Sequence, residues 1–433
     1  LFRSQTWLFH SLCTFQTSGK NVNQYIRDAQ ATLKDDPGNY LALFVEPFRD
    51  KLRDGRYSDQ TIADYCSSVF HFGEWLRAEG IATRDVNSAH IRVFLQDHIP
   101  NCQCARHIRG KPNHILSALN HLLRLMRDLG ATDRPMPDAI DLEVDGFDRA
   151  LQDVWGLAAS TRSQHRRALR RLFRQFSTSE VMGSISADAD MIRNFVLDGT
   201  PCLDTIRDRS VFIRCYLRYR KLQGDDVSSL LRAVPRPTAM IDQPLPEALT
   251  PSELTELLGA FDATVPGQKR GYAIARCLAD IGMRSSEVAR LRLDDVDWAQ
   301  GVIHILPGKG RRAESLPLPR STGEALVDYI QNERPQTDCR MIFVRNKPPV
   351  GLPVGRRVVQ RAIQDAYARL GWNRSRVHIL RHTLATHLIS AGAPVPQVAD
   401  VLRHRDITTT SIYARVNSDH LSRVAMPWPG SLD

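Results

Sequence analysis

Six side chains in the C-terminal half of the chain are of types that act on phosphodiester bonds. Guanidinium groups bind phosphate oxygens in pairs, imidazole and ammonium groups move protons, and a tyrosine hydroxyl can attack phosphorus. His378 and Arg381 stand three residues apart, a spacing that places two side chains on one face of a helix. The other four groups lie on either side of this pair: Arg284, Lys309, His404 and Tyr413.

These residues fall in three segments. They are GMRSSEVARL from Gly282, ILPGKGRRAESLPLP from Ile305 and SRVHILRHTLATHLISAGAPVPQVADVLRHRDITTTSIYARV from Ser375. In this order the segments resemble the catalytic domain of the tyrosine recombinases, the phage-integrase family, over roughly the last 180 residues. Each residue taken alone could be structural, as an ion-pair partner, a turn lysine or a half-buried tyrosine. The joint match favours the functional interpretation.

The resemblance implies a reaction through a covalent link between protein and DNA. Tyr413 would be the nucleophile, joined to a 3′-phosphate while a 5′-hydroxyl leaves and can later attack in reverse. Arg284 and Arg381 would bind the non-bridging oxygens, on which negative charge develops in the transition state. Lys309, between two glycines, would give a proton to the leaving oxygen.

The remaining matched positions would support this chemistry. His378 and His404 would bond to the scissile phosphate and assist proton movement, and Glu287 would orient Arg284 or a histidine. No carboxylate cluster suited to magnesium accompanies the motifs. We therefore expect no metal and no cofactor, with catalysis in the presence of a chelator.

Two positions depart from the family pattern. Arg403 stands where glycine most often precedes the histidine, and Met283 replaces the usual leucine before Arg284. Neither change removes a reacting group. Arg403 puts the local turn in question and offers an additional phosphate contact.

A catalytic domain over residues 248–420 must position these groups. Thr250, Pro251 and Glu253 predict a helix start with a capping box. Two short strands, 302–306 and 314–318, are expected around the turn at Lys309. Further helices are expected over 271–281, 322–332, 354–370, 375–391 and 396–402.

Upstream, apolar residues at helical spacing predict two all-helical bundles, over 39–132 and 140–232. In the first, Gly80 and Gly130 are expected to end helices, and Ser88 to cap a helix over 86–99. A proline-rich linker, 233–247, follows the second. Residues 1–38 and 421–433 are expected to be tails, the latter either disordered or docked on a neighbouring subunit.

The fold class is therefore mainly α, with an α+β catalytic domain that carries a small antiparallel sheet. The resemblance adds that the bundles are SAM-like and that a core-binding bundle closes with the catalytic domain around duplex DNA. Similar positions in the two bundles, such as Phe48 and Phe147, suggest a tandem repeat. Alternatively, two unrelated helical modules look alike.

One helix in the second bundle is strongly cationic. Its expected span is 161–176, with no acidic residue among its arginines. A solvated helix usually mixes charge signs, so a phosphate-contacting face is the favoured interpretation over a merely solvated one. The candidate DNA-binding residues are Arg162, Arg166, Arg167, Arg170, Arg171 and Arg174.

Composition favours a globular protein with a polyanionic partner. The 433 residues are 42% hydrophobic and 24% charged, and the net charge is +10. Eight scattered cysteines favour reduced thiols and a cytosolic, nucleoid-associated protein. His98, Cys102, Cys104 and His107 fit no standard zinc spacing, so no metal site is predicted there.

No apolar run reaches the length of a membrane span, and the N-terminus is a poor match to a signal peptide. The chain does not begin with methionine, which is consistent with a truncated or over-extended start.

Three functions compete. The first is a site-specific recombinase, integrase or mobile-element transposase that works as a tetramer on double-stranded DNA at a specific site. The second is a monomeric type IB topoisomerase-like relaxing enzyme. The third is a catalytically silent DNA-binding accessory factor, which the intact set of six groups disfavours.

Overall fold

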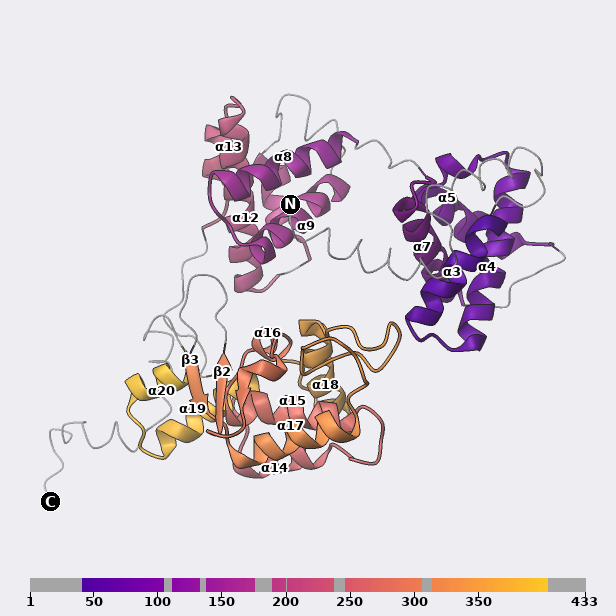
Figure 1. The fold of residues 1–433 in the computed structure, drawn as a ribbon. Coiled ribbons are helices and arrows are strands. Elements are labelled where there is room, and N and C mark those ends of the chain that lie inside the picture. Colours follow the sequence, from indigo (N-terminus) through magenta and orange to yellow (C-terminus); the bar gives the residue numbers. More distant parts are fainter. Residues whose placement is uncertain are drawn as a thin grey trace, which may run out of the picture. The chain divides into compact units, whose positions relative to one another are not determined.

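The computed structural model describes residues 41–104, 111–132, 138–175, 189–199, 201–236, 246–305 and 314–403. Figure 1 shows three groups of elements, and each is described by itself. Buried apolar side chains form one cluster in the first group, one in the second and two in the third. The segment Pro135–Pro244, which contains the second group, is a compact unit of its own.

The first group is a helical bundle, as predicted. Its elements are α3 (Ala42–Asp54), α4 (Asp59–Ala78), η2 (Thr83–Asp85), α5 (Ser88–Val93), η3 (Phe94–His98), α6 (Ile99–Asn101) and α7 (Pro112–Asp128). Apolar residues recur three and four positions apart along α4, and this stripe lies in the core: Ile62, Tyr65, Val69, Phe72 and Leu76 are all buried.

The helix ends in this bundle can be compared with the predicted helix stops and the predicted helix cap. Gly80 and Gly130 have φ of +69° and +67°, the left-handed conformation that ends helices, so both predictions are confirmed. The predicted cap at Ser88 is wrong, because Asn87 caps the helix with its side chain. The single predicted helix over 86–99 is also interrupted, since Phe94–His98 winds as a π-helix.

The second group is also helical. It contains α8 (Ala139–Asp153), α9 (Ala159–Gln175), α11 (Ala189–Leu197), α12 (Leu203–Leu222) and α13 (Ser228–Ala233). Phe147 and Leu151 are fully buried here, as Phe48 and Leu52 are in the first bundle. This burial is compatible with a repeated plan, which stays a prediction.

The third group combines helices with a small sheet. Its elements are α14 (Pro251–Gly259), α15 (Gln268–Asp280), α16 (Ser285–Val288), η4 (Leu293–Asp295), β1 (Val296–Asp297), β2 (Val302–Ile305), β3 (Glu314–Pro317), α17 (Arg320–Asn332), α18 (Arg356–Arg369), α19 (Ile379–Ser390) and α20 (Val395–Leu402). The buried helix α15 contacts α17, α18 and α19. It therefore fixes the segment that follows it against α19.

Local signals in this domain are largely confirmed. The Thr250 hydroxyl accepts a bond from the Glu253 amide, and the Glu253 carboxylate accepts one from the Thr250 amide, which is the predicted capping box. The strands β2 and β3 pair antiparallel, with Ile303 opposite Leu316. A third strand, β1, was not predicted and pairs antiparallel with β2.

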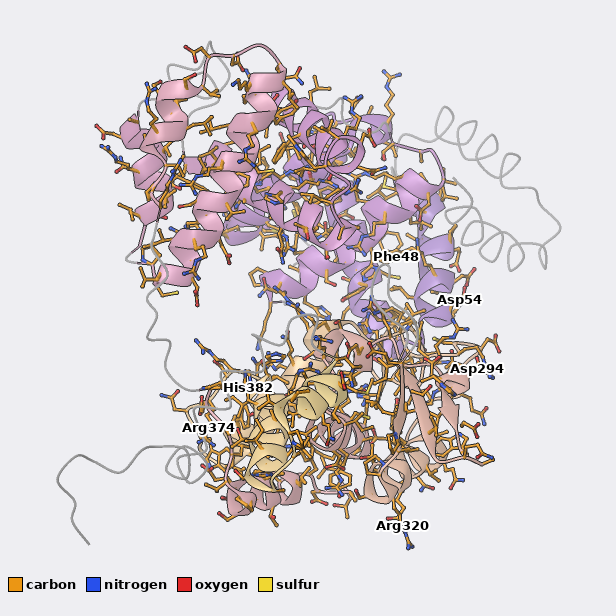
Figure 2. All side chains as sticks on the ribbon, turned by 90° about the vertical axis from the view of Figure 1, so that its left-hand side faces the viewer. Phe48, Asp54, Asp294, Arg320, Arg374 and His382 are labelled. Atoms are coloured by element: carbon orange, nitrogen blue, oxygen red, sulfur yellow. The ribbon has the colours of Figure 1, made fainter. Side chains whose placement is uncertain are left out.

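The helix that carries Arg381 begins later than predicted. The sequence predicts a start at 375, but α19 starts at Ile379 and His378 is its N-cap. Ahead of it, Arg374 pairs with Glu247 at 2.8 Å and with Glu253 of α14 at 3.0 Å. Figure 2 labels Arg374 and, on α19, His382. These ion pairs tie the entrance of α19 to α14.

Several sequence-based expectations lie outside the described residues. They concern the two tails, 1–38 and 421–433, most of the linker, 237–245, and the expected turn between β2 and β3.

Candidate active site

Arg284 lies between two helices and is held by a carboxylate. It is the N-cap of α16, and one of its guanidinium nitrogens donates to Oε1 of Glu287 at 2.8 Å. Its backbone amide donates to the other oxygen of that carboxylate, also at 2.8 Å. About a third of the Arg284 side chain is exposed, so its guanidinium remains accessible. The expectation that Glu287 orients Arg284 agrees with this geometry.

Arg381 is fully buried and bound to main-chain oxygens. Its guanidinium donates to the carbonyl oxygens of Gly282 and Leu402, which follow α15 and end α20. These two bonds hold the guanidinium between the segment after α15 and the end of α20. The positive charge of Arg381 is therefore held in a fixed position.

His378 lies beside both arginines. Its ring meets that of His382 edge-on, with 4.9 Å between the ring centroids. The pKa of His378 is lowered to about 4, first by loss of hydration and then by the charges of His382, Arg381 and Arg284. The Glu287 carboxylate opposes this shift. At neutral pH the imidazole is therefore neutral in the DNA-free protein.

The structure shows how arginine is accommodated at position 403, where the family most often has glycine. Arg403 has φ of +55°, the left-handed conformation that explains why glycine suits this position. Only 2% of the Arg403 side chain is exposed, and the expected phosphate contact stays a prediction. Its guanidinium pairs with Glu287 at 2.9 Å and donates to the Gly282 carbonyl at 3.2 Å.

Glu287 thus forms ion pairs with both Arg284 and Arg403. Burial alone would raise the pKa of its carboxyl group, but the charge of Arg403 and the bonds from Arg284 outweigh burial, so the pKa is lowered. The carboxylate is ionised at neutral pH and links α16 to the end of α20. This link was not predicted, because the sequence analysis considered Arg403 only for the local turn and as an additional phosphate contact.

Gly282 connects the segment after α15 to α19 and to the end of α20 through hydrogen bonds. The sequence analysis did not identify it as a site residue. Its carbonyl accepts bonds from both Arg381 and Arg403. Its φ is +63°, and an added Cβ would lie 2.9 Å from the Leu384 side chain and 3.1 Å from that of Leu402. The available signal was a glycine two residues before Arg284, where the backbone must turn.

The structure therefore brings together three of the six predicted groups: Arg284, His378 and Arg381. Lys309, His404 and Tyr413 lie outside the described residues. However, β2 and β3 lie on either side of the segment that contains Lys309 in the sequence, and Arg403 immediately precedes His404. The described part of the site offers two guanidiniums and a neutral imidazole, a set that binds a phosphate and stabilises added negative charge on it.

The arginines of α9 differ in exposure and in their hydrogen-bond and ion-pair partners. The helix has no acidic residue among them, but acids on neighbouring segments pair with Arg162 (Asp148, 3.6 Å), Arg170 (Asp141, 3.1 Å) and Arg171 (Asp198, 2.8 Å). Arg167 and Arg174 are exposed, and each donates to a carbonyl of its own helix. Arg166 is half-buried. The uniform cationic face expected from the sequence is thus partly neutralised.

The mostly helical domain and the grouping of two arginines with a histidine agree with the class that the sequence resemblance indicated, the DNA strand-transferring enzymes. The phage integrase family model matches residues 247–420. The putative integrase/recombinase y4rA of Sinorhizobium fredii is 31% identical over 417 residues, which cover 94% of this chain and 99% of that protein. The chain belongs to the phage integrase family of tyrosine recombinases, as the resemblance implied, and is a site-specific recombinase that cuts and rejoins DNA strands.

Other relatives agree. The tyrosine recombinase XerD of Mycobacterium tuberculosis is 30% identical over 311 residues, covering 67% of this chain and 97% of that protein. The solved structure of the XerH site-specific recombinase matches with a TM-score of 0.50 and 18% identity, over 77% of this chain and 93% of that one. This likeness supports the fold. Among the described residues, no helix has the length and apolarity to span a membrane.

Proposed function

We propose that the protein cuts and rejoins DNA at a specific site through a 3′-phosphotyrosyl link at Tyr413. The observation that carries this proposal is the joint position of Arg284, His378 and Arg381 at one corner of the catalytic domain. Two guanidiniums and an imidazole there match the needs of a phosphate that gains charge during attack. Tyr413 follows this corner in the sequence, ten residues after Arg403.

The proposed reaction conserves the energy of the phosphodiester bond. The Tyr413 oxygen attacks phosphorus, the bond to the 5′-oxygen breaks, and Lys309 gives that oxygen a proton. The phosphotyrosine keeps the 3′ end attached until a 5′-hydroxyl attacks in reverse. Arg284 and Arg381 hold the non-bridging oxygens, while His378 and His404 bond to the phosphate and relay protons. This chemistry needs no cofactor.

The proposed partner is double-stranded DNA bearing a recombination site, acted on in the cytoplasm at the nucleoid. The net charge of +10 and the exposed arginines Arg167 and Arg174 support a polyanionic partner. The XerH structure is a post-cleavage complex with palindromic difH substrate. We extend this mode of action to the present chain, with four subunits that exchange strands in pairs.

The proposed division of labour follows the predicted domains. The bundle at 140–232 and the catalytic domain at 248–420 would grip one DNA duplex, joined by the linker 233–247. The arginines of α9 would contact phosphates, with Arg167 and Arg174 the most available. The bundle at 39–132 would bind a second DNA element or another subunit. Its separate hydrophobic core supports an independent role.

The decisive experiment traps the covalent link. Purified protein is incubated with nicked duplexes made from the DNA ends of its own mobile element, in EDTA, and separated on a denaturing gel. We expect a DNA-linked band for the wild type and none for Tyr413→Phe. Tyr272→Phe serves as the matched control, because Tyr272 lies on α15 against Phe261 and should keep the band.

The other outcomes separate the competing functions. An adduct that survives Tyr413→Phe would identify another nucleophile and overturn the assignment. A gel shift with no adduct would favour the accessory DNA-binding factor. Relaxation of supercoiled DNA without any recombinant product would favour the topoisomerase-like enzyme.

A further inference from the structure

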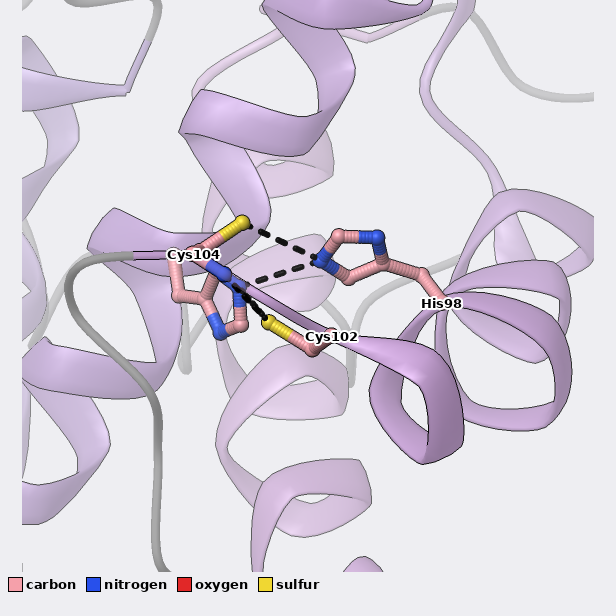
Figure 3. A group of neighbouring side chains, drawn as sticks. His98, Cys102 and Cys104 are labelled. Atoms are coloured by element: carbon pink, nitrogen blue, oxygen red, sulfur yellow. Dashed lines mark hydrogen bonds between the residues drawn. The ribbon is translucent and has the colours of Figure 1, made fainter.

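Four metal-binding side chains converge in the first bundle, far along the sequence from the catalytic residues: His71, His98, Cys102 and Cys104. One ligand atom from each lies within 4.8 Å of all the others. Nε2 of His98 is 3.1 Å from Nε2 of His71, and Sγ of Cys102 is 3.2 Å from that same atom of His71. Sγ of Cys104 is 3.8 Å from Nε2 of His98 (Figure 3).

These spacings are those of a tetrahedral zinc site. Zinc bonds of about 2.0 Å to nitrogen and about 2.3 Å to sulfur give tetrahedron edges of about 3.3 Å between nitrogens and about 3.5 Å between nitrogen and sulfur. The observed 3.1, 3.2 and 3.8 Å lie close to those edges. Two imidazoles and two thiolates are also a ligand set that structural zinc commonly takes.

The elements explain how the four side chains meet. His71 lies inside α4 and is only 1% exposed, while His98 is the last residue of the π-helix η3. Cys102 and Cys104 follow the short helix α6, in a segment that leaves the core. A π-turn inserts one residue into a helix and is often found at functional positions. Here the π-helix ends at one ligand, His98, and precedes two others, Cys102 and Cys104.

The surroundings are apolar and aromatic. The ring of Phe94 meets that of His71 edge-on at 5.3 Å and stacks on that of His98 at 5.2 Å.

We propose that His71, His98, Cys102 and Cys104 bind one structural zinc ion. Binding releases two thiol protons, so a divalent ion, two thiolates and two neutral imidazoles form a site with no net charge. A neutral site fits a half-buried position better than separate charges would. The ion would cross-link the middle of α4 to the residues that directly follow α6.

The proposal replaces the sequence-based expectation of no metal. That expectation considered His107 as the fourth ligand and found no standard spacing. His71 lies 27 positions before His98, on another helix, so only the fold reveals it. The zinc is distinct from the strand-transfer chemistry, and the proposed function does not depend on it.

The test begins with untagged full-length protein purified under reducing conditions. We expect elemental analysis to find about one zinc per chain. Replacement by cobalt should give the visible bands of a tetrahedral ion together with a near-ultraviolet thiolate-to-cobalt band. Cys102→Ser and Cys104→Ser should each weaken metal binding at least about tenfold and reduce that band. Cys202→Ser, an exposed cysteine of the second bundle, is the matched control.

Three results would overturn the proposal. One is a chain that carries no zinc as purified and takes up neither zinc nor cobalt under reducing conditions. Another is a cobalt spectrum without the thiolate band, which can be judged on the wild type alone even where a variant fails to fold. The third is undiminished binding by both serine variants. Tyrosyl-adduct formation by the wild type, measured separately, keeps this outcome distinct from failure of the proposed function.

Discussion

At the scale of single residues, the site holds its charges in place before any DNA arrives. Arg381 is fixed by two carbonyls, Arg284 by a carboxylate, and His378 is kept neutral beside them. A preorganised positive site loses little energy in reorganisation when charge develops on the phosphate. The pKa of His378 is therefore a direct report on this arrangement.

His378 should titrate near pH 4 in the DNA-free protein, well below the ordinary value of about 6.5. Between these two pH values the unfolded chain binds more protons at this position than the folded chain does. The contribution of His378 to folding stability therefore rises with pH over this window. Histidine NMR resonances, assigned with His378→Gln, would measure the midpoint.

A phosphate beside His378 should reverse this shift, because a negative charge favours imidazolium. DNA binding near pH 6 should then take up a proton, and affinity should increase as the pH falls. In His378→Gln this part of the pH dependence should disappear. A midpoint at or above pH 6.5 in the free protein would contradict the expected electrostatics.

At the scale of elements, one glycine joins the end of α15 to the end of α20. The Gly282 carbonyl receives bonds from Arg381 and Arg403, and its backbone conformation leaves no room for a side chain. The packing of these segments and the position of a reacting group are thus set by the same residue.

Gly282→Ala should destabilise the protein by about 2–4 kcal/mol, since it adds left-handed strain and a clash with two leucines. It should also slow strand cleavage by about tenfold or more, because a displaced Arg381 no longer meets the phosphate correctly. Thermal unfolding and single-turnover cleavage would measure the two effects.

Gly301→Ala is the matched control. Its φ of +61° is nearly that of Gly282, but nothing lies within 4 Å of an added Cβ. It should lose only the backbone cost of about 1–2 kcal/mol and keep its cleavage rate. Equal losses of activity in both variants would show that strain alone, and not the clash at the site, is responsible.

The elements also show which features the sequence could predict. Local signals were sufficient for the capping box at Thr250 and the helix ends at Gly80 and Gly130, because each depends on neighbours within a few residues. The two-residue strand β1 is too short for a pattern and exists through its pairing with β2. The π-helix at Phe94–His98 likewise leaves no periodic signature.

Contacts between distant residues were harder to predict. The resemblance identified Arg284, His378 and Arg381, and the structure groups them, but it could not show that Arg403 binds Glu287, 116 positions away. The acids that neutralise Arg170 and Arg171 lie 29 and 27 positions away. Such pairings depend on how helices pack, which spacing along one helix does not contain.

At the scale of the whole molecule, affinity for DNA should depend on a few exposed arginines and on salt. Ion pairs at the surface are weak, so those at Arg170 and Arg171 could exchange for phosphate, but Arg167 and Arg174 need no exchange. They are therefore the most available phosphate-binding side chains on α9.

Replacing Arg167 and Arg174 together by glutamine should weaken binding to all DNA sequences alike. The slope of log affinity against log salt should fall by about 1 for each phosphate that the protein no longer neutralises. Arg193→Gln with Arg207→Gln is the control pair, since each of these arginines pairs with an acid of its own helix. Fluorescence anisotropy at several salt concentrations would make the measurement, and identical slopes for both pairs would place DNA elsewhere.

The buried pair of Arg403 and Glu287 carries a consequence for how this protein can change over generations. Substitution of Arg403 by glycine would relieve a left-handed backbone but leave Glu287 with one arginine fewer. Loss of Glu287 would take from the buried Arg403 guanidinium the carboxylate that lies 2.9 Å away. Either single step is harmful, whereas a paired change need not be. Positions 287 and 403 should therefore change together. A lineage that carries arginine at position 403 would have little access to glycine there by single substitutions.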